Sequence, residues 1–194
     1  MILKLKSAVL LTFALSGFLF APPSQAQSAC ITFEPPDFFL GDVFGRPAAQ
    51  VSGNLAFSSN GIDGYVYNFL TFAGPTFNRA DVVNAPIAFS PGQSLRTNNI
   101  NIQFDFTNLP FTARKVTFLY LDLGGNENLA PNPGGIYVGE LSSAPPVLNG
   151  TNVTVSTAPV PGGKRGSVTI TAPAVNQVRV GGQELWIDSV CATP

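Results

Sequence analysis

Carboxylates and amides are the side chains with which this sequence can do chemistry, because it contains no histidine and only two cysteines. Without histidine there is no Ser-His-Asp or Cys-His nucleophile and no His-ligated metal. A pair of carboxyl groups, as in glycoside hydrolysis, is the remaining catalytic arrangement. The acidic candidates are Glu34, Asp122, Glu127, Glu140, Glu184 and Asp188. Because their spacing selects no pair, we predict that the protein is not an enzyme, with a carboxylate-based glycosidase as the alternative.

The densest cluster of oxygen donors is the segment 122–128, Asp-Leu-Gly-Gly-Asn-Glu-Asn. Asp122 ends a predicted strand, and Asn126, Glu127 and Asn128 follow a double glycine. Side-chain oxygens in such a loop can coordinate a hard cation such as Ca²⁺ or accept hydrogen bonds from sugar hydroxyls. Asn and Gly are also ordinary turn formers, so a purely structural turn is the alternative.

Asp188 stands inside the apolar segment 185–190 and needs a partner if it is buried. That partner is a cation or a set of backbone donors, unless the strand turns this face to solvent. If Cys30 pairs directly with Cys191, Glu34 shares the face of the cysteines and Asp188 lies on the opposite one. Glu34 and Asp188 then meet only through a bulge, a shifted register or a backbone carbonyl.

Flat aromatic rings are the other candidate ligand contacts, since a ring face can lie against a sugar ring. The available rings are Trp186, Tyr65, Tyr67, Tyr120 and Tyr137. Trp186 is the only tryptophan, and packing in the core is the competing use of its ring.

The elements that must position these groups are short strands. Nineteen glycines and 17 prolines interrupt the chain, and runs of alternating apolar and polar residues lie between them. We predict strands over residues 100–106, 115–123, 152–156, 167–171, 178–180 and 184–191. Weaker signals cover 55–58, 65–72, 85–89 and 135–141, and 78–83 resembles one helical turn. This pattern predicts one antiparallel β-sandwich domain, a jelly roll, over residues 27–194.

The first residues are typical of a secretory signal peptide. Lys4 and Lys6 precede an apolar run over residues 8–20, and the small-residue end Ser-Gln-Ala26 follows, so we predict removal of residues 1–26. Ten basic residues less these two leave 8 against 11 acidic ones, a net charge of −3. We therefore expect a secreted protein, extracellular or periplasmic, that has no membrane span and does not bind nucleic acid.

The two cysteines of an exported chain are expected to form a disulfide. Cys30 lies near the start of the predicted domain and Cys191 near its end. The bond would therefore join neighbouring N- and C-terminal strands. Two thiols without histidine cannot build a closed zinc site, which is the competing use.

Three segments carry a resemblance to a known family: Ile-Thr-Phe-Glu at 31–34, Val-Thr-Phe-Leu-Tyr-Leu-Asp-Leu-Gly-Gly at 116–125, and Leu-Trp-Ile-Asp-Ser-Val at 185–190. Together they resemble the galactose-binding-like jelly-roll domains of secreted bacterial proteins, which include many carbohydrate-binding modules. The resemblance implies a glycan partner and a calcium ion near the terminal strands, with Glu34 and Asp188 as ligands.

The expected function is thus a secreted, non-catalytic protein that binds extracellular or cell-wall carbohydrate, with calcium support. Its expected ligand contacts are Trp186, Tyr120, Asn126, Glu127 and Asn128, and its expected metal ligands are Glu34, Asp122 and Asp188. The alternative is a self-associating structural or assembly subunit of an extracellular matrix or filament.

Overall fold

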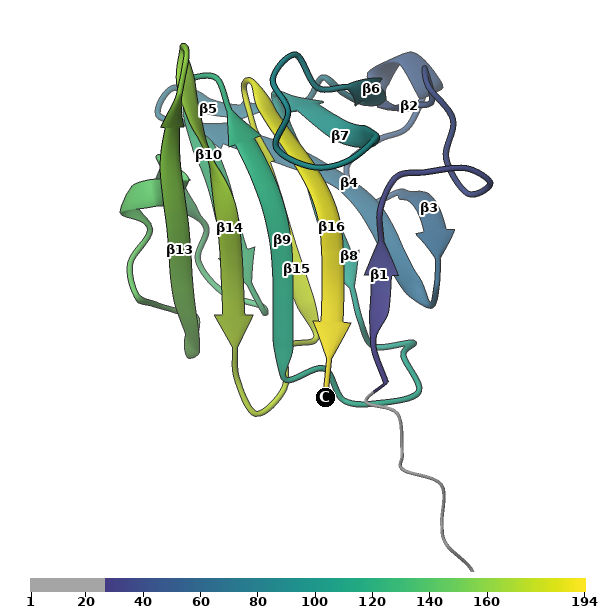
Figure 1. Ribbon diagram of the computed structural model, residues 1–194, viewed down its shortest axis with the longest axis vertical. Helices are drawn as coiled ribbons and strands as arrows, with labels where there is room; N and C mark the ends of the chain where they lie inside the picture. Colours follow the sequence, from purple (N-terminus) through teal and green to yellow (C-terminus); the bar gives the residue numbers. More distant parts are fainter. Residues whose placement is uncertain (1–26) are drawn as a thin grey trace, which may run out of the picture.

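Two antiparallel β-sheets pack face to face in the computed structural model, which describes residues 27–194 (Figure 1). The predicted signal peptide lies outside the described residues. The first sheet has the order β12 (Val147–Leu148), β13 (Thr151–Val160), β14 (Gly163–Thr171), β9 (Lys115–Asp122), β16 (Leu185–Thr193), β7 (Gln93–Asn98), β6 (Arg79–Asn84) and β2 (Val43–Gly45), with β1 (Ala29–Ile31) also paired to β16. The predicted β-sandwich is confirmed.

The second sheet faces the first across the core. Its order is β11 (Tyr137–Gly139), β10 (Glu127–Pro131), β15 (Gln177–Gly182), β8 (Ile100–Asp105), β4 (Ile62–Thr71) and β3 (Leu55–Ser59), with β5 (Gly74–Thr76) paired to β4. Two single-turn 3₁₀ helices, η1 (Arg46–Ala48) and η2 (Leu141–Ser143), complete the elements. None of the helices in residues 27–194 has the length and apolarity that crossing a bilayer requires.

Strict alternation of apolar and polar residues produces the central strand of the second sheet. In β8, Ile100, Ile102 and Phe104 are fully buried in the core between the sheets. Asn101 and Gln103 therefore lie on the opposite, outer face, because successive side chains of a strand point to opposite sides. The inner face of β8 thus belongs to the core, and its outer face is free to carry polar chemistry.

Aromatic rings fill one end of the core. Phe33 and Phe57 pack against each other and against Phe38 and Phe104, with ring centroids 5.1–6.4 Å apart in tilted and edge-on arrangements. Each fully buried Phe contributes about 1.5–3 kcal/mol from its removal from water. This cluster joins the N-terminal segment to the second sheet, which fixes the start of the domain.

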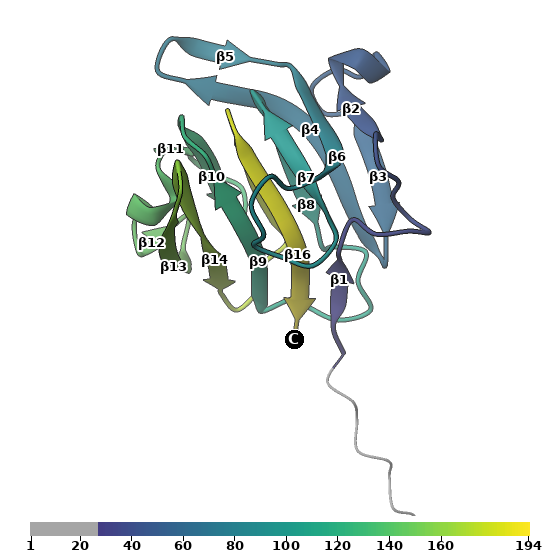
Figure 2. The ribbon, with the colours of Figure 1, turned by 45° about the horizontal axis from the view of Figure 1, so that its top comes forward.

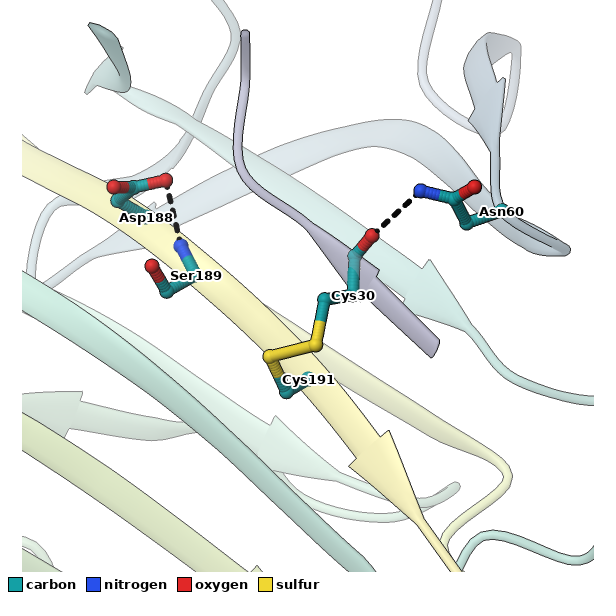
Figure 3. The surroundings of a disulfide bond; sticks show 5 residues. All are labelled: Cys30, Asn60, Asp188, Ser189 and Cys191. Atoms are coloured by element: carbon teal, nitrogen blue, oxygen red, sulfur yellow. Dashed lines mark hydrogen bonds between the residues drawn. A yellow bond between two sulfur atoms is a disulfide. The ribbon is translucent and has the colours of Figure 1, made fainter. Parts of the chain in front are cut away.

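The N- and C-terminal strands are neighbours, as predicted. Cys30 of β1 pairs in register with Cys191 of β16, and the two form the disulfide (Figure 3). The side chain of Asn60 donates a hydrogen bond of 2.9 Å to the carbonyl of Cys30. Because β7 pairs only with residues 185–187 of β16, the edge at residues 190–192 is left for β1.

A β-bulge interrupts β16 at Ser189. The register with β9 shifts between Asp188 and Cys191, and Ser189 has a positive φ of 51°. The bulge lets Ile187 and Val190 both face the core although they are three residues apart. Asp188 remains on the outer face of the first sheet.

Two weak sequence signals were wrong. Residues 79–84 form strand β6 and no helical turn, because Ala80 and Val82 alternate into the core. Residues 85–89 form no strand but begin a loop, 85–92, whose prolines Pro86 and Pro91 supply no backbone donor for a ladder. We call residues 85–92 the covering loop, because they cross the outer side of β16 and β9 in both views (Figures 1 and 2).

Candidate functional site

The outer face of the second sheet gathers aromatic and polar side chains from strands that are distant in sequence. In one row, Tyr65 of β4 pairs with Gln103 of β8, which pairs with Arg179 of β15. In the next row, Tyr67 of β4 pairs with Asn101 of β8. Cross-strand neighbours share a face, so these five side chains lie on one surface.

One part of this outer face is closed by the end of β4. Here β4 continues into β5 as a hairpin, which Figure 2 shows reaching over the end of the sandwich towards β10. The side-chain amide of Asn128 accepts the N–H of Leu70 at 2.7 Å and donates to its carbonyl at 2.9 Å. Asn101 donates to Asn128 at 2.9 Å and to the carbonyl of Asn68 at 2.8 Å.

A glycine lets these two amides meet. Gly181 lies between Asn128 and Asn101 in the sheet, and a Cβ there would lie 2.6 Å from the amide oxygen of Asn101. Both asparagines are fully buried. Asn128, an expected ligand contact, therefore holds β10 to β4 instead of facing solvent.

The other part of the outer face stays open, and a cation is fixed on it. The guanidinium of Arg179 lies 3.7 Å over the ring centroid of Tyr67, a cation–π contact that spans β8. Its Nε and Nη2 donate to the side-chain oxygen of Gln103 at 3.3 and 2.7 Å. Partial burial lowers the pKa of Arg179, and the nearby Tyr67 opposes that shift. We call the surface of Tyr65, Tyr67, Gln103 and Arg179 the tyrosine–arginine face.

A pocket of about 290 Å³ opens at the border of the tyrosine–arginine face. Its walls come from β4, β8, β10 and β15 and from the loop that follows β10. The lining residues are Tyr67, Gln103, Ala130, Asn132, Pro133, Gly134, Ile136, Gln177 and Arg179. Asn132 fixes the loop, since it donates to the carbonyl of Ala174 at 3.0 Å and accepts the N–H of Asn176 at 2.8 Å.

The acidic end of the same face is occupied by internal hydrogen bonds. Asp63 and Asp105 are cross-strand neighbours. Asp63 accepts hydrogen bonds from Ser58 and Asn108, and Asp105 accepts both the N–H and the hydroxyl of Thr107. These bonds offset the repulsion between the two carboxylates.

Two predicted aromatic contacts are buried. Tyr120 is fully buried in the core, with its hydroxyl 2.7 Å from that of Thr157. Trp186 lies on the outer face of the first sheet but is only 6% exposed, on the side that the covering loop crosses. Neither ring presents a face to solvent, and neither lies on the tyrosine–arginine face.

The predicted donor loop at 122–128 is shorter than expected, because Glu127 and Asn128 already belong to β10. Glu127 is fully buried, and burial followed by the charge of Asp122 raises its pKa to about 8. Its Oε2 accepts the N–H of Leu141 at 3.2 Å, its Oε1 is buried without a hydrogen-bond partner, and its carboxyl group interacts with that of Asp122. Asp122 in turn accepts the N–H of Gly124 at 2.8 Å.

The remaining polar residue of that segment, Asn126, lies in the turn between β9 and β10. Its backbone N–H donates to the side-chain oxygen of Gln183 at 3.1 Å, which ties this turn to the turn between β15 and β16. The side chains of Asp122, Glu127 and Asn128 and the backbone of Asn126 are therefore engaged in hydrogen bonds within the domain.

Glu34 and Asp188 do approach each other, through the bulge at Ser189. The pKa of Asp188 is raised to about 6, chiefly by burial and in smaller part by the charge of Glu34. Asp188 accepts the N–H of Ser189 at 2.6 Å, and Glu34 accepts the N–H of Gln93 at 2.5 Å. Ser90 of the covering loop lies near Asp188 and acts to lower its pKa. Glu34 thus holds this loop to the body of the domain, and Asp188 lies beside it.

Within residues 27–194, no three acidic or cysteine side chains gather in a way that could hold a metal ion. The three predicted metal ligands lie in two separate places: Glu34 is near Asp188, and Asp122 is paired instead with Glu127, an expected ligand contact. The calcium site stays a prediction of the sequence.

Sequence reasoning missed the polar residues that complete the candidate site, Arg179, Gln177 and Asn132. A signal was present, because polar residues alternate at 63, 65 and 67, at 101, 103 and 105, and at 177 and 179. Alternation marks the outward face of each strand but not which strands are neighbours. Only the order β15-β8-β4 brings Arg179 to Tyr67.

The tyrosine–arginine face therefore combines two partly exposed rings and a guanidinium fixed by the buried Gln103, beside a pocket to which Gln177 adds an amide. In comparisons with known proteins, no family model, curated protein or solved structure matches the chain. Tyrosine rings can contact a flat ligand surface, and the guanidinium of Arg179 can donate hydrogen bonds to an uncharged or anionic polar group.

Proposed function

We propose that the protein is a secreted, non-catalytic binding module that recognises extracellular or cell-wall carbohydrate on the tyrosine–arginine face. The observation that carries this proposal is the arrangement of Tyr65, Tyr67, Gln103 and Arg179 on one open surface beside a pocket. Sugars present apolar ring faces and a rim of hydroxyls. Tyrosine rings complement the first, and guanidinium and amide groups complement the second.

Preorganisation of the surface supports binding. Arg179 is fixed from two sides, by the ring of Tyr67 and by the side-chain oxygen of Gln103. Immobilising a long side chain on binding costs about 0.5–1.5 kcal/mol, and here much of that cost is already met on folding. A small contact area with a sugar therefore suffices for net affinity, because little side-chain entropy is lost when the sugar binds.

The burial of the carboxyl pair supports the non-catalytic part of the proposal. A general acid must come within hydrogen-bonding reach of the substrate. Glu127, with its raised pKa, has the property of such an acid but is fully buried, and one of its oxygens accepts the N–H of Leu141. Burial and the charge of Asp122 account for its raised pKa without a catalytic role.

Export and calcium support belong to the same proposal. A disulfide such as Cys30–Cys191 persists in oxidising compartments outside the cytosol. Calcium is tested by thermal unfolding of the mature protein with calcium and with chelator. Calcium at about 100 times its dissociation constant would stabilise the fold by about 2.7 kcal/mol, and no shift would remove calcium from the proposal.

The glycan proposal is tested by binding of the oxidised mature protein to an array of soluble and insoluble polysaccharides. We expect binding to at least one class, and a loss of about tenfold or more in Tyr65→Ala, since a central tyrosine is often worth about 2 kcal/mol in an interface. Phe72→Ala is the matched control, because Phe72 is 81% exposed and lies outside the tyrosine–arginine face. A blank array, or equal losses in both variants, would contradict the proposal.

The second candidate is a self-associating subunit of an extracellular matrix or filament. The edge strands favour it: β3 and β12, at the ends of the two sheets, expose Leu55 to 51% and Val147 to 59%. Exposed apolar edge strands can pair with further copies. Sedimentation at high protein concentration tests it, and a strict monomer removes this candidate.

A further inference from the structure

The pocket beside the tyrosine–arginine face contains a positive charge without a carboxylate partner. The ion pairs among the described residues join Arg79 and Arg96 to Asp81, and Lys164 to Glu140. None of them includes Arg179. Its two side-chain hydrogen bonds go to Gln103, which is neutral.

The geometry leaves the outer edge of this guanidinium free. An arginine has five N–H donors, of which one on Nε and one on Nη2 point at Gln103. The two donors of Nη1 and the second donor of Nη2 remain. One hydrogen from each of these nitrogens forms the parallel fork that fits the two oxygens of a carboxylate.

The remainder of the pocket suits a single sugar residue. Its volume of about 290 Å³ is at the small end of ligand pockets. Gln177 adds an amide, and Asn132 and Pro133 lie in the loop that forms its wall. Tyr65 and Tyr67 lie about 6.8 Å apart along β4, at two residues of about 3.4 Å each. Their rings can therefore contact successive sugar residues of an oligosaccharide that extends out of the pocket.

We propose that the pocket binds the carboxylate of an acidic sugar, so that the protein recognises glycans that contain uronic acid. The carboxylate accepts two hydrogen bonds from Nη1 and Nη2 of Arg179, while Gln177 contacts the neighbouring hydroxyls. This inference rests on the proposed function and adds the chemical class of the ligand.

The acidic residues of the face are placed so that they do not compete for Arg179. Asp63 and Asp105 lie at the other end of the face and are occupied by Ser58, Asn108 and Thr107. Neither carboxylate contributes to the pKa shift of Arg179, whose causes are burial and Tyr67.

The net charge of −3 on residues 27–194, from 8 basic and 11 acidic residues, gives no general attraction for polyanions. Selectivity for a carboxylate must therefore come from the local contact with Arg179.

The test compares oligouronates with the same oligosaccharides after reduction of their carboxyl groups to alcohols, by titration calorimetry. We expect the unmodified protein to bind the oligouronate at least tenfold more tightly than the reduced form. Arg179→Gln should abolish this preference, Arg179→Lys should keep part of it, and Arg114→Gln should leave it intact. Arg114 is an exposed arginine at the end of the sandwich and is the matched charge control.

The outcomes separate this inference from the proposed function. Equal or tighter binding of the reduced oligosaccharide would overturn the carboxylate inference and leave glycan binding in place. Absence of binding to any carbohydrate would overturn both. Tighter binding of a sulfated oligosaccharide would overturn the carboxylate assignment. If Arg179→Gln does not fold, the comparison of the two ligands with the unmodified protein still decides the question.

Discussion

Buried carboxyl groups in this domain are stabilised in two different ways. Asp81 lies in an ion pair with Arg96, which donates two hydrogen bonds to it at 2.9 and 2.6 Å. Glu127 has no cationic partner and is neutral at pH 7, because burial and the charge of Asp122 raise its pKa to about 8. The environment of each carboxyl group therefore decides whether it takes part in an ion pair or is neutral.

The pKa of Glu127 predicts that rising pH destabilises the fold. Below about pH 4.5, the ordinary pKa of a glutamate, the carboxyl group is protonated in both folded and unfolded chains. Between pH 4.5 and about 8 the unfolded chain releases the proton and the folded chain retains it, so the free energy of unfolding falls. The size of the effect is about 1.4 kcal/mol for each pKa unit between the two states.

Glu127→Gln should flatten this dependence, since a glutamine amide can donate to Asp122 and its oxygen can accept the N–H of Leu141. Urea unfolding at several pH values between 5 and 8 measures it. Glu184→Gln, which changes an exposed carboxylate, is the control and should leave the slope unchanged. An equal slope in the Glu127 variant and the original protein would contradict the prediction.

At the scale of elements, the covering loop closes the outer side of the first sheet. Glu34 holds its end through the N–H of Gln93, and Arg165 donates to the carbonyl of Ala88 at 2.7 Å. Asp188 lies on the same side, near Ser90. These polar contacts hold a proline-containing segment that cannot join a strand, on the side of the sheet where Trp186 is buried outside the core.

Glu34→Ala should loosen the covering loop. Removing the acceptor leaves the N–H of Gln93 without its partner, which costs about 1–3 kcal/mol for a buried group. Because Trp186 is the only tryptophan, its fluorescence reports the change directly. We expect emission at longer wavelength and stronger quenching by acrylamide.

Circular dichroism of the Glu34 variant should show that the sheets are retained. Glu184→Ala is the control, because Glu184 is exposed and lies in the turn between β15 and β16. Unchanged emission and quenching in a folded Glu34→Ala protein would mean that the loop does not depend on this contact.

At the scale of the whole molecule, the disulfide closes almost the entire domain into one loop. Cys30 and Cys191 are 161 residues apart and join the two terminal strands at one end of the sandwich (Figure 1). In the chain-entropy model a loop of this length destabilises the unfolded chain by about 5 kcal/mol. The same ends are also held by strand pairing and by the phenylalanine cluster.

Removing the disulfide should therefore lower the free energy of unfolding by up to about 5 kcal/mol while the fold is retained. The double variant Cys30→Ser, Cys191→Ser is compared with the oxidised protein by urea unfolding. The reduced original protein serves as a control and should match the variant. A difference below about 1 kcal/mol would show that the unfolded chain gains little freedom from opening this loop.

The sequence alone determined the fold class, the pairing of the terminal strands and the disulfide. These follow from local alternation and from the presence of only two cysteines, which leave few alternatives. The sequence also placed Glu34 and Asp188 on opposite faces of a regular strand pair, so that a bulge or a similar irregularity was needed for them to meet. Such a bulge is present at Ser189.

Only the tertiary structure decided which strands are neighbours and which outer faces stay open. Tyr67 and Arg179 are 112 residues apart and become partners because β8 separates β4 from β15. Trp186 and Asn128, which the sequence offers as ligand contacts, are buried because the covering loop crosses one face and the β4–β5 hairpin closes part of the other. Period-2 alternation states which side of its own strand a residue faces. What covers that side depends on segments elsewhere in the chain.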